Sequence, residues 1–269
     1  MQGASRSALA ESREVLSRAL EQGTDRSQLG EELLRVAGVI GGNAVLRRSL
    51  ADPSREAQPK VDLINRLFAG RVSDEALHVA STVASRRWAA EGDLTATLES
   101  FGVESILAHA EAAGRLSQVE DELFRFGRIV DGTGELRSAL TDRRAPAAAK
   151  ARVVKSLLGD RSAPETVRLA ELAATHRSTR FDHAVEGYLT IAARRQEQLT
   201  ATVTTAVPLT AQQFERLTAA LGAHYDRAVR VNAVVDPQVV GGIRVDIGDE
   251  VIDGTILSRL DEARRRMTS

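Results

Sequence analysis

Cysteine is absent from this 269-residue chain, which excludes disulfides, thiolate metal sites, iron–sulfur clusters and cysteine nucleophiles. Aromatic residues make up only 3%, so stacking platforms for nucleic-acid bases are not expected. The 36 basic and 37 acidic residues nearly cancel, which argues against binding to nucleic acid through bulk charge. No apolar run approaches the roughly 20 residues needed to cross a bilayer, and the N-terminus lacks a secretory signal pattern. These absences predict a soluble cytoplasmic protein.

Strong helix formers dominate residues 1–197, where Ala, Leu, Arg and Glu are the commonest types. Apolar residues recur at steps of three and four, as in the stretch 29–40, which predicts amphipathic helices. We expect one helix to start at Asp52, with Pro53 in its first turn, because this pair is favoured at helix starts. Residues 91–93, Glu-Gly-Asp, are expected to close another helix.

This helical region contains an internal repeat with an offset of 90 residues. Segments 28–87 and 118–177, aligned without a gap, are identical at 17 of 60 positions. The alternative is a coincidence between two Ala- and Arg-rich amphipathic regions. A period of 90 exceeds the roughly 33–47 residues of helical solenoid repeats, so each copy is expected to form a bundle of five or six helices. The identical pairs include Glu32/Glu122, Leu33/Leu123, Arg35/Arg125, Leu46/Leu136, Arg47/Arg137, Leu50/Leu140, Asp52/Asp142, Lys60/Lys150, Leu67/Leu157, Glu75/Glu165 and Arg87/Arg177.

Beyond about residue 198 the pattern is that of a small mixed domain. β-branched residues alternate with others in short runs bounded by Gly and Pro, which predicts strands. Strands are expected at 200–207, 229–235, 243–247 and 250–252, and helices at 210–224 and from Thr255 onward. The sequence therefore predicts a mainly α chain. Two tandem helical bundles, 1–95 and 96–197, are followed by a small α+β domain, 198–269.

Patterns for catalysis or ligand binding are missing. The Gly241-Gly242 pair has no lysine placed as in a phosphate loop, and neither a zinc-binding HExxH nor a nucleophile-elbow GxSxG pattern occurs. His176 and His183 could share a helix face, but we expect a loop at 177–180 to separate them. We therefore predict no catalytic, cofactor-binding or metal-binding residues, no cofactor and no enzyme activity.

Charged and aromatic residues on the helices have plain structural interpretations. The carboxylate pairs 31–32 and 121–122 are expected on solvated helix faces, in ion pairs with arginines four residues away. Trp88 is expected to pack between helices, with an exposed anchor for a partner as the alternative. The run 264–266, three arginines, suits the end of a helix, with contact to an acidic partner as the alternative.

The C-terminal region carries an ordered series of motifs over residues 235–260. The series is an Asp, a Gly-Gly pair, an alternating strand, Gly-Asp, then Val-Ile-Asp-Gly-Thr and a Leu-bearing helix. It resembles the C-terminal signature of the ATP synthase delta subunit family, whose mitochondrial relative is the oligomycin-sensitivity-conferring protein. The segment 204–214 resembles the family's strand followed by Leu-Thr-x-x-Gln. The matching positions are Asp236, Gly241, Gly242, Gly248, Asp249, Val251, Ile252, Asp253, Gly254, Thr255 and Leu260.

The resemblance implies a non-catalytic stator subunit of the proton-translocating ATP synthase. In the family, the helical bundle grips N-terminal segments of the alpha subunits, and the C-terminal domain holds the membrane-anchored b subunit. The assembly resists rotor torque at the cytoplasmic face of the bacterial plasma membrane. The chain is about one bundle longer than the usual subunit, and the internal repeat accounts for the excess, as in enlarged actinobacterial forms. Two alternatives remain: a helical RNA-binding or transcription module, and an enzyme with an unrecognised site in the C-terminal domain.

Overall fold

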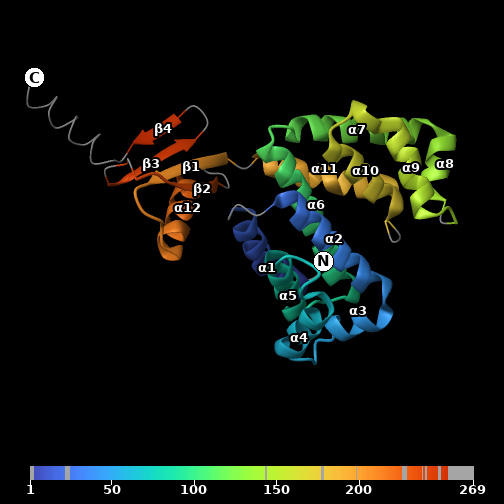
Figure 1. Cartoon of the computed structure of the whole chain (residues 1–269), viewed down its shortest axis with the longest axis horizontal. Helices are drawn as coiled ribbons and strands as arrows, with labels where there is room; N and C mark the ends of the chain where they lie inside the picture. The colour runs from blue at the N-terminus through green and yellow to red at the C-terminus, as the bar shows by residue number, and fades with distance from the viewer. Residues whose placement is uncertain are drawn as a thin grey trace, which may run out of the picture. The chain divides into compact units, whose positions relative to one another are not determined.

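The computed structural model describes residues 3–21, 25–142, 144–176, 179–197, 199–225, 229–237, 239, 241–247 and 250–253. The chain divides into two compact units, Met1–Ala192 and Ala193–Ser269. The first unit is built of helices and the second contains a four-stranded sheet (Figure 1). The predicted fold class, two tandem bundles followed by a small α+β domain, is confirmed. No helix in the described residues is long and apolar enough to cross a membrane.

The helical unit comprises two bundles that share one helix, α6. Helices α2 to α5 recur as α7 to α10, and every start and end is shifted by 90 residues. The 90-residue offset of the sequence repeat is therefore also the offset between corresponding helices of the two bundles. The first bundle contains α1 (Gly3–Glu21), α2 (Arg26–Gly42), α3 (Ala44–Ala51), α4 (Ala57–Phe68), α5 (Asp74–Ser85) and the start of α6 (Glu91–Ala112). The second contains the rest of α6 with α7 (Leu116–Gly132), α8 (Gly134–Thr141), α9 (Ala147–Leu158), η1 (Gly159–Arg161), α10 (Pro164–Thr175) and α11 (Phe181–Glu197).

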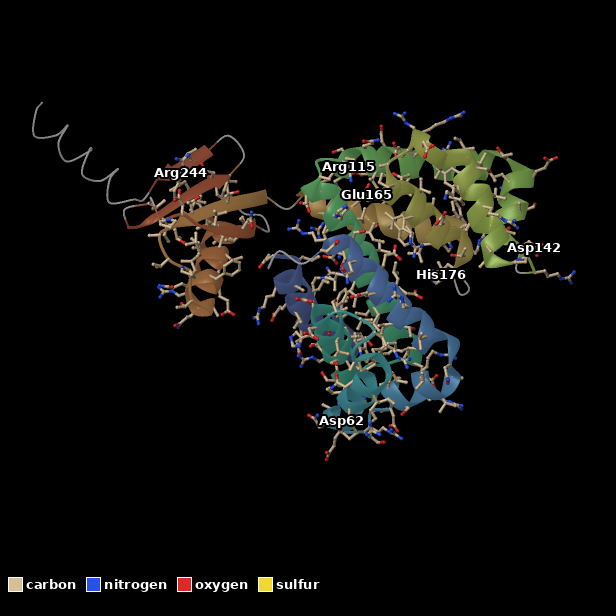
Figure 2. All side chains as sticks on the ribbon, viewed as in Figure 1. Asp62, Arg115, Asp142, Glu165, His176 and Arg244 are labelled. Carbon is tan, nitrogen blue, oxygen red and sulfur yellow. The ribbon has the colours of Figure 1, made fainter. Side chains whose placement is uncertain are left out.

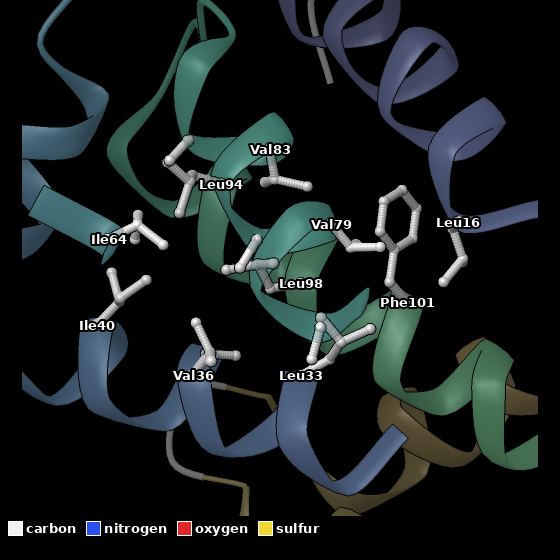
Figure 3. Packing of buried hydrophobic residues seen from close by; sticks show 14 of the residues in the cluster. Leu16, Leu33, Val36, Ile40, Ile64, Val79, Val83, Leu94, Leu98 and Phe101 are labelled. Atoms are coloured by element: carbon white, nitrogen blue, oxygen red, sulfur yellow. The ribbon is translucent and has the colours of Figure 1, made fainter. Parts of the chain in front are cut away.

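Helix α6 supplies side chains to both hydrophobic cores. Its first half places Leu94, Leu98 and Phe101 in the core of the first bundle, where α2 and α5 pack against them (Figure 3). Its second half places Ile106 and Leu107 in the core of the second bundle. The division expected between residues 95 and 96 falls within this continuous helix. That domain boundary stays a prediction.

Two predicted helix boundaries are wrong. Asp52 follows the end of α3 instead of starting a helix, and its carboxylate accepts the Ser54 backbone N–H at 2.9 Å, so Pro53 lies in a turn. Residues 91–93 begin α6 instead of closing a helix. Glu91 and Asp93 in the first turn suit the positive end of the helix dipole, which explains why this acidic segment starts a helix.

The second unit has strand order β2-β1-β3-β4. Strand β1 pairs parallel with β2 and antiparallel with β3, which pairs antiparallel with β4. Helix α12 connects the parallel pair, and its Phe214, Leu217 and Leu221 pack with the sheet residues Val203 and Val231. The elements are β1 (Leu199–Thr205), α12 (Ala211–Tyr225), β2 (Val229–Val235), β3 (Ile243–Ile247) and β4 (Glu250–Asp253).

The predicted strands and the helix after Thr210 are confirmed. Thr210 and Gln213 form a reciprocal cap, in which each backbone N–H donates to the other's side chain. Gly241 and Gly242 both have positive φ, at 65° and 87°, a backbone region that favours glycine. The turn at 248–249, the helix predicted from Thr255 and the arginines 264–266 lie outside the described residues.

Candidate partner-binding surface

Both bundles place a carboxylate against the start of a helix at the same repeat position, and this carboxylate is buried in the first copy and half-buried in the second. Glu32 on α2 is 6% exposed and accepts two hydrogen bonds from Ser73, from the backbone N–H at 2.9 Å and from Oγ at 2.6 Å. Ser73 precedes α5, so the carboxylate satisfies donors at the start of that helix. The side-chain amide of Gln28 donates to the other carboxylate oxygen at 3.0 Å. The expectation that residues 31–32 both lie on a solvated face is therefore wrong for Glu32.

Glu122 on α7 repeats this arrangement at the start of α10. It accepts the Ala163 N–H at 2.9 Å, the Thr166 hydroxyl at 2.6 Å and the Gln118 amide at 2.8 Å. The hydroxyl comes from a different position, because Ala163 stands where the first bundle has Ser73. The same anchoring contact is thus kept in both copies with different donors.

Burial alone would raise the pKa of both carboxyls. For Glu32, hydrogen bonds from Ser73 and Gln28 outweigh burial and hold the pKa below its ordinary value. For Glu122, hydrogen bonds from Thr166 and Gln118 have the same effect on its pKa. Both groups are therefore ionised at neutral pH. Their role is to fix the helices, since their oxygens are occupied by donors of the same bundle.

The two bundles are joined by close contacts across α2, α6 and α10. Gly30 and Gly102 lie where α2 crosses α6, and a Cβ built on Gly102 would lie 3.0 Å from the carbonyl oxygen of Gly30. The Arg168 guanidinium on α10 donates to both oxygens of Glu31 on α2, with Nη2 at 2.8 Å from Oε2. Sequence reasoning missed this ion pair, because a charge on a helix gives no sign of a partner more than a hundred residues away.

His176 makes a second polar contact across the junction. Its Nε2 lies 2.9 Å from a carboxylate oxygen of Glu99 on α6, and its Nδ1 accepts the Thr179 backbone N–H at 3.1 Å when the ring is neutral. His183 instead lies 3.5 Å from Glu186 on its own helix. The two histidines therefore face different carboxylates, and the part of the chain that the structure describes contains no group of three potential metal ligands.

The hydrogen bond with Glu99 raises the pKa of His176 above its ordinary value of 6.5, although burial opposes the shift. A raised folded-state pKa stabilises the fold fully below about pH 6.5, and this contribution is lost as the pH rises through the folded-state pKa. We therefore expect Glu99→Gln to destabilise the chain more at about pH 5.5 than at about pH 9. Urea unfolding at the two pH values measures the difference. An equal loss at both would contradict the assignment.

Trp88 packs inside the first bundle. It is 4% exposed, and its indole N–H donates to the Val83 carbonyl at 2.9 Å. The packing interpretation is confirmed and the exposed-anchor alternative is wrong.

A further ion pair joins Arg115 at the α6–α7 turn to Glu165 at the start of α10 (Figure 2). Neither feature offers a surface to a partner.

Exposed apolar side chains mark the surfaces available to partners among the described residues. In the helical unit they lie on α2, α3, α7 and α9, and in the second unit on or beside strands. Burying such residues against another protein is favourable at about 25 cal/mol per Å². The set comprises Val39, Val45, Phe124, Ile129, Leu157, Val207, Val234, Val235, Val251 and Ile252.

Comparison with known proteins identifies the family. Residues 103–267 match the family model described as ATP synthase delta (OSCP) subunit. A protein of Kineococcus radiotolerans named ATP synthase subunit delta is 45% identical over 98% of this chain and 97% of its own length. Proteins of the same name from Streptomyces avermitilis and Acidothermus cellulolyticus are 44% and 42% identical over 99% and 100% of this chain. The matches to these three relatives, unlike the family model, also include the first bundle, so the chain belongs to the ATP synthase delta (OSCP) subunit family.

Proposed function

We propose that this chain is a non-catalytic peripheral-stalk subunit of a proton-translocating ATP synthase. It ties the catalytic alpha/beta head to the membrane-anchored b subunit and keeps the head from turning with the rotor. The observation that carries the proposal is the nearly full-length match to proteins named ATP synthase subunit delta. Such a tie transmits force between partners and requires no reaction centre of its own.

The construction of the helical unit supports this role. The bundles share α6, α2 crosses this helix closely at Gly30 and Gly102, and the Glu31–Arg168 ion pair joins α2 to α10. A stator transmits torque with less deformation when its parts are packed rigidly against one another. In the proposal the bundles hold N-terminal segments of the alpha subunits, and the α+β domain holds the b subunit. The chain then sits at the cytoplasmic face of the plasma membrane, attached indirectly through b.

Reconstitution of the complete enzyme tests the proposal. Membrane vesicles that carry the rotor ring, the a and b subunits and the catalytic head, but no delta-type subunit, are energised with a proton gradient. Addition of the full chain is expected to restore ATP synthesis and to bring the head and b into one sedimenting complex. Bovine serum albumin at the same concentration serves as the control. The proposal is contradicted if synthesis in the complete system does not depend on the chain.

A further inference from the structure

The ring of His176 has a hydrogen-bond partner on each of its nitrogens. His176 is the residue that ends α10 (Figure 2). Its Nε2 lies 2.9 Å from a Glu99 carboxylate oxygen, and its Nδ1 lies 3.1 Å from the backbone nitrogen of Thr179. Glu99 belongs to α6, whereas Thr179 belongs to the connection between α10 and α11. One side chain therefore holds two different parts of the helical unit.

The two contacts set different requirements for the protons of the ring. A carboxylate accepts hydrogen bonds and donates none, so Nε2 carries a proton when it binds Glu99. A backbone N–H donates, so Nδ1 must be without a proton to accept the Thr179 N–H. Both contacts are satisfied together only by the neutral ring with its proton on Nε2. A second proton, on Nδ1, turns the Glu99 contact into an ion pair and leaves two N–H donors facing each other at Thr179.

We propose that His176 is a proton-operated switch between these two contacts. The neutral ring fixes the connection before α11 through Thr179. The protonated ring releases the Thr179 N–H and binds Glu99 of α6 more tightly. Proton uptake thus loosens the chain just before α11 and strengthens the contact of α10 with α6. The inference goes beyond the proposed function, because it concerns the chain alone and holds whichever proteins the chain binds.

The surroundings of the ring suit such a switch. Among the described residues, Glu99 supplies the charge that raises the pKa of His176, and burial opposes this shift. The His176 side chain is only 13% exposed, so salt screens its contact with Glu99 less than it screens a surface pair. Histidine is also the side chain whose ordinary pKa, 6.5, lies closest to neutrality. The switch therefore responds to pH changes that leave most other side chains unaltered.

The neighbouring charged groups that the structure describes interact with one another. Burial raises the pKa of Tyr188 on α11, so its hydroxyl stays neutral in the range where histidine titrates. Arg177 lies outside the described residues, and its charge is therefore removed in one of the controls below. The described charged groups near the ring and its two partners, on α2, α10, α11 and the connection between the last two, are Glu31, Arg168, Glu171, Arg180 and Asp182.

Nitrogen-15 NMR of the full chain tests the switch without any substitution. The chemical shifts of the ring nitrogens show which of them carries the proton, and we expect Nε2 in the neutral form. The exchange of the Thr179 amide with water is compared with that of an unstructured peptide at the same pH. This relative rate is expected to rise about fivefold as His176 gains its second proton, which is the loss of one ordinary hydrogen bond. A neutral ring with its proton on Nδ1, or a relative rate that stays constant while the ring titrates, would overturn the inference.

Two replacements of His176 separate the contacts. The side-chain oxygen of asparagine takes the place of Nδ1, and the side-chain amide of glutamine reaches the place of Nε2. His176→Asn is expected to keep slow exchange of the Thr179 amide at every pH, because the amide oxygen accepts and does not titrate. His176→Gln is expected to give fast exchange at every pH while keeping the contact with Glu99. A pH-dependent relative rate in either variant would contradict the switch.

The matched control is His183→Gln. His183 also lies beside a glutamate, 3.5 Å from Glu186, but both belong to α11. This variant and Arg177→Gln are both expected to keep the pH dependence of the Thr179 exchange. Loss of the dependence in either would assign the effect to a group other than His176 and overturn the inference.

A double-mutant cycle measures the other half of the switch, the contact between α10 and α6. It combines His176→Gln with Glu99→Gln and uses urea unfolding of the full chain. The coupling between the two side chains, expressed in the unfolding equilibrium constant, is expected to be about fivefold larger at about pH 5.5 than at about pH 9. A coupling that is equal at both pH values, or larger in alkali, would show that proton uptake does not strengthen this contact.

Discussion

Gly30→Leu is expected to lower the free energy of unfolding by about 3 kcal/mol, at the upper end of the usual cost of overpacking. A Cβ at this position would lie 2.9 Å from the carbonyl oxygen of Gly102 and 2.9 Å from Ile106 Cγ1. The first of these atoms is backbone in the middle of α6, so it cannot move aside without separating the helices. Because α6 serves both cores, the strain reaches both bundles. Denaturant unfolding followed by the fluorescence of the single tryptophan, Trp88, measures the loss.

The control for this change lies on the same helix. A Cβ at Gly38 meets nothing within 4 Å. Gly38→Leu is therefore expected to leave stability unchanged or to raise it by up to about 1 kcal/mol, because leucine has the higher helix propensity. Equal losses in the two variants would contradict the assignment of the loss to the close crossing of α2 and α6.

Glu122→Ala is expected to lower the free energy of unfolding by about 3 kcal/mol, and Glu32→Ala by a similar amount. Each change leaves donors at the start of a helix buried without an acceptor, and hydrogen bonds to a charged group are the most costly to lose. Asp121→Ala, next to Glu122 but exposed, removes only the ion pair with Arg125 and is expected to cost less than about 0.5 kcal/mol. Circular dichroism during urea unfolding gives all three values.

The pH dependence of stability provides a second test of the Glu32 and Glu122 carboxylates. Their folded-state pKa values are lowered, so their contribution is present above the unfolded-state value and is lost as the pH falls through the folded-state value. The stability difference between the unchanged chain and Glu122→Gln should therefore shrink under acid conditions. A difference that stays constant down to the acid unfolding transition would exclude the carboxylate charge as the cause.

The repeat made the helical unit predictable from the sequence. Glu32, Leu33, Leu50 and their equivalents at 122, 123 and 140 recur because each copy needs the same helix start and the same core positions filled. The hydrogen bonds of these carboxylates inside the bundles could not be predicted from the sequence. Glu32 lies in the same local sequence pattern whether its side chain faces water or accepts hydrogen bonds from Ser73 at the start of another helix. Only the tertiary packing distinguishes the two cases.

The junction between the bundles was not predictable in the same way. Residues 91–93 include a glycine and two acids, which favour both the end of one helix and the start of another. Residue 102, where α6 passes from the first core toward the second, is a single glycine inside a helical pattern, and such a glycine does not indicate which helix packs against it. The contact of Glu31 with Arg168 spans 137 positions and leaves no periodic trace. Local patterns therefore indicated the two copies but not how they are joined.

The shared helix also restricts how chain length can change among relatives that have both bundles. One additional residue inserted in the middle of α6 would turn everything after it by about 100° around the helix axis and shift it by about 1.5 Å. The Arg168 side chain would then point away from Glu31, and Gly102 would no longer meet Gly30. Chain-length variation between relatives is consequently expected in the loops before and after α6, whereas the spacing within it is held fixed by two cores at once.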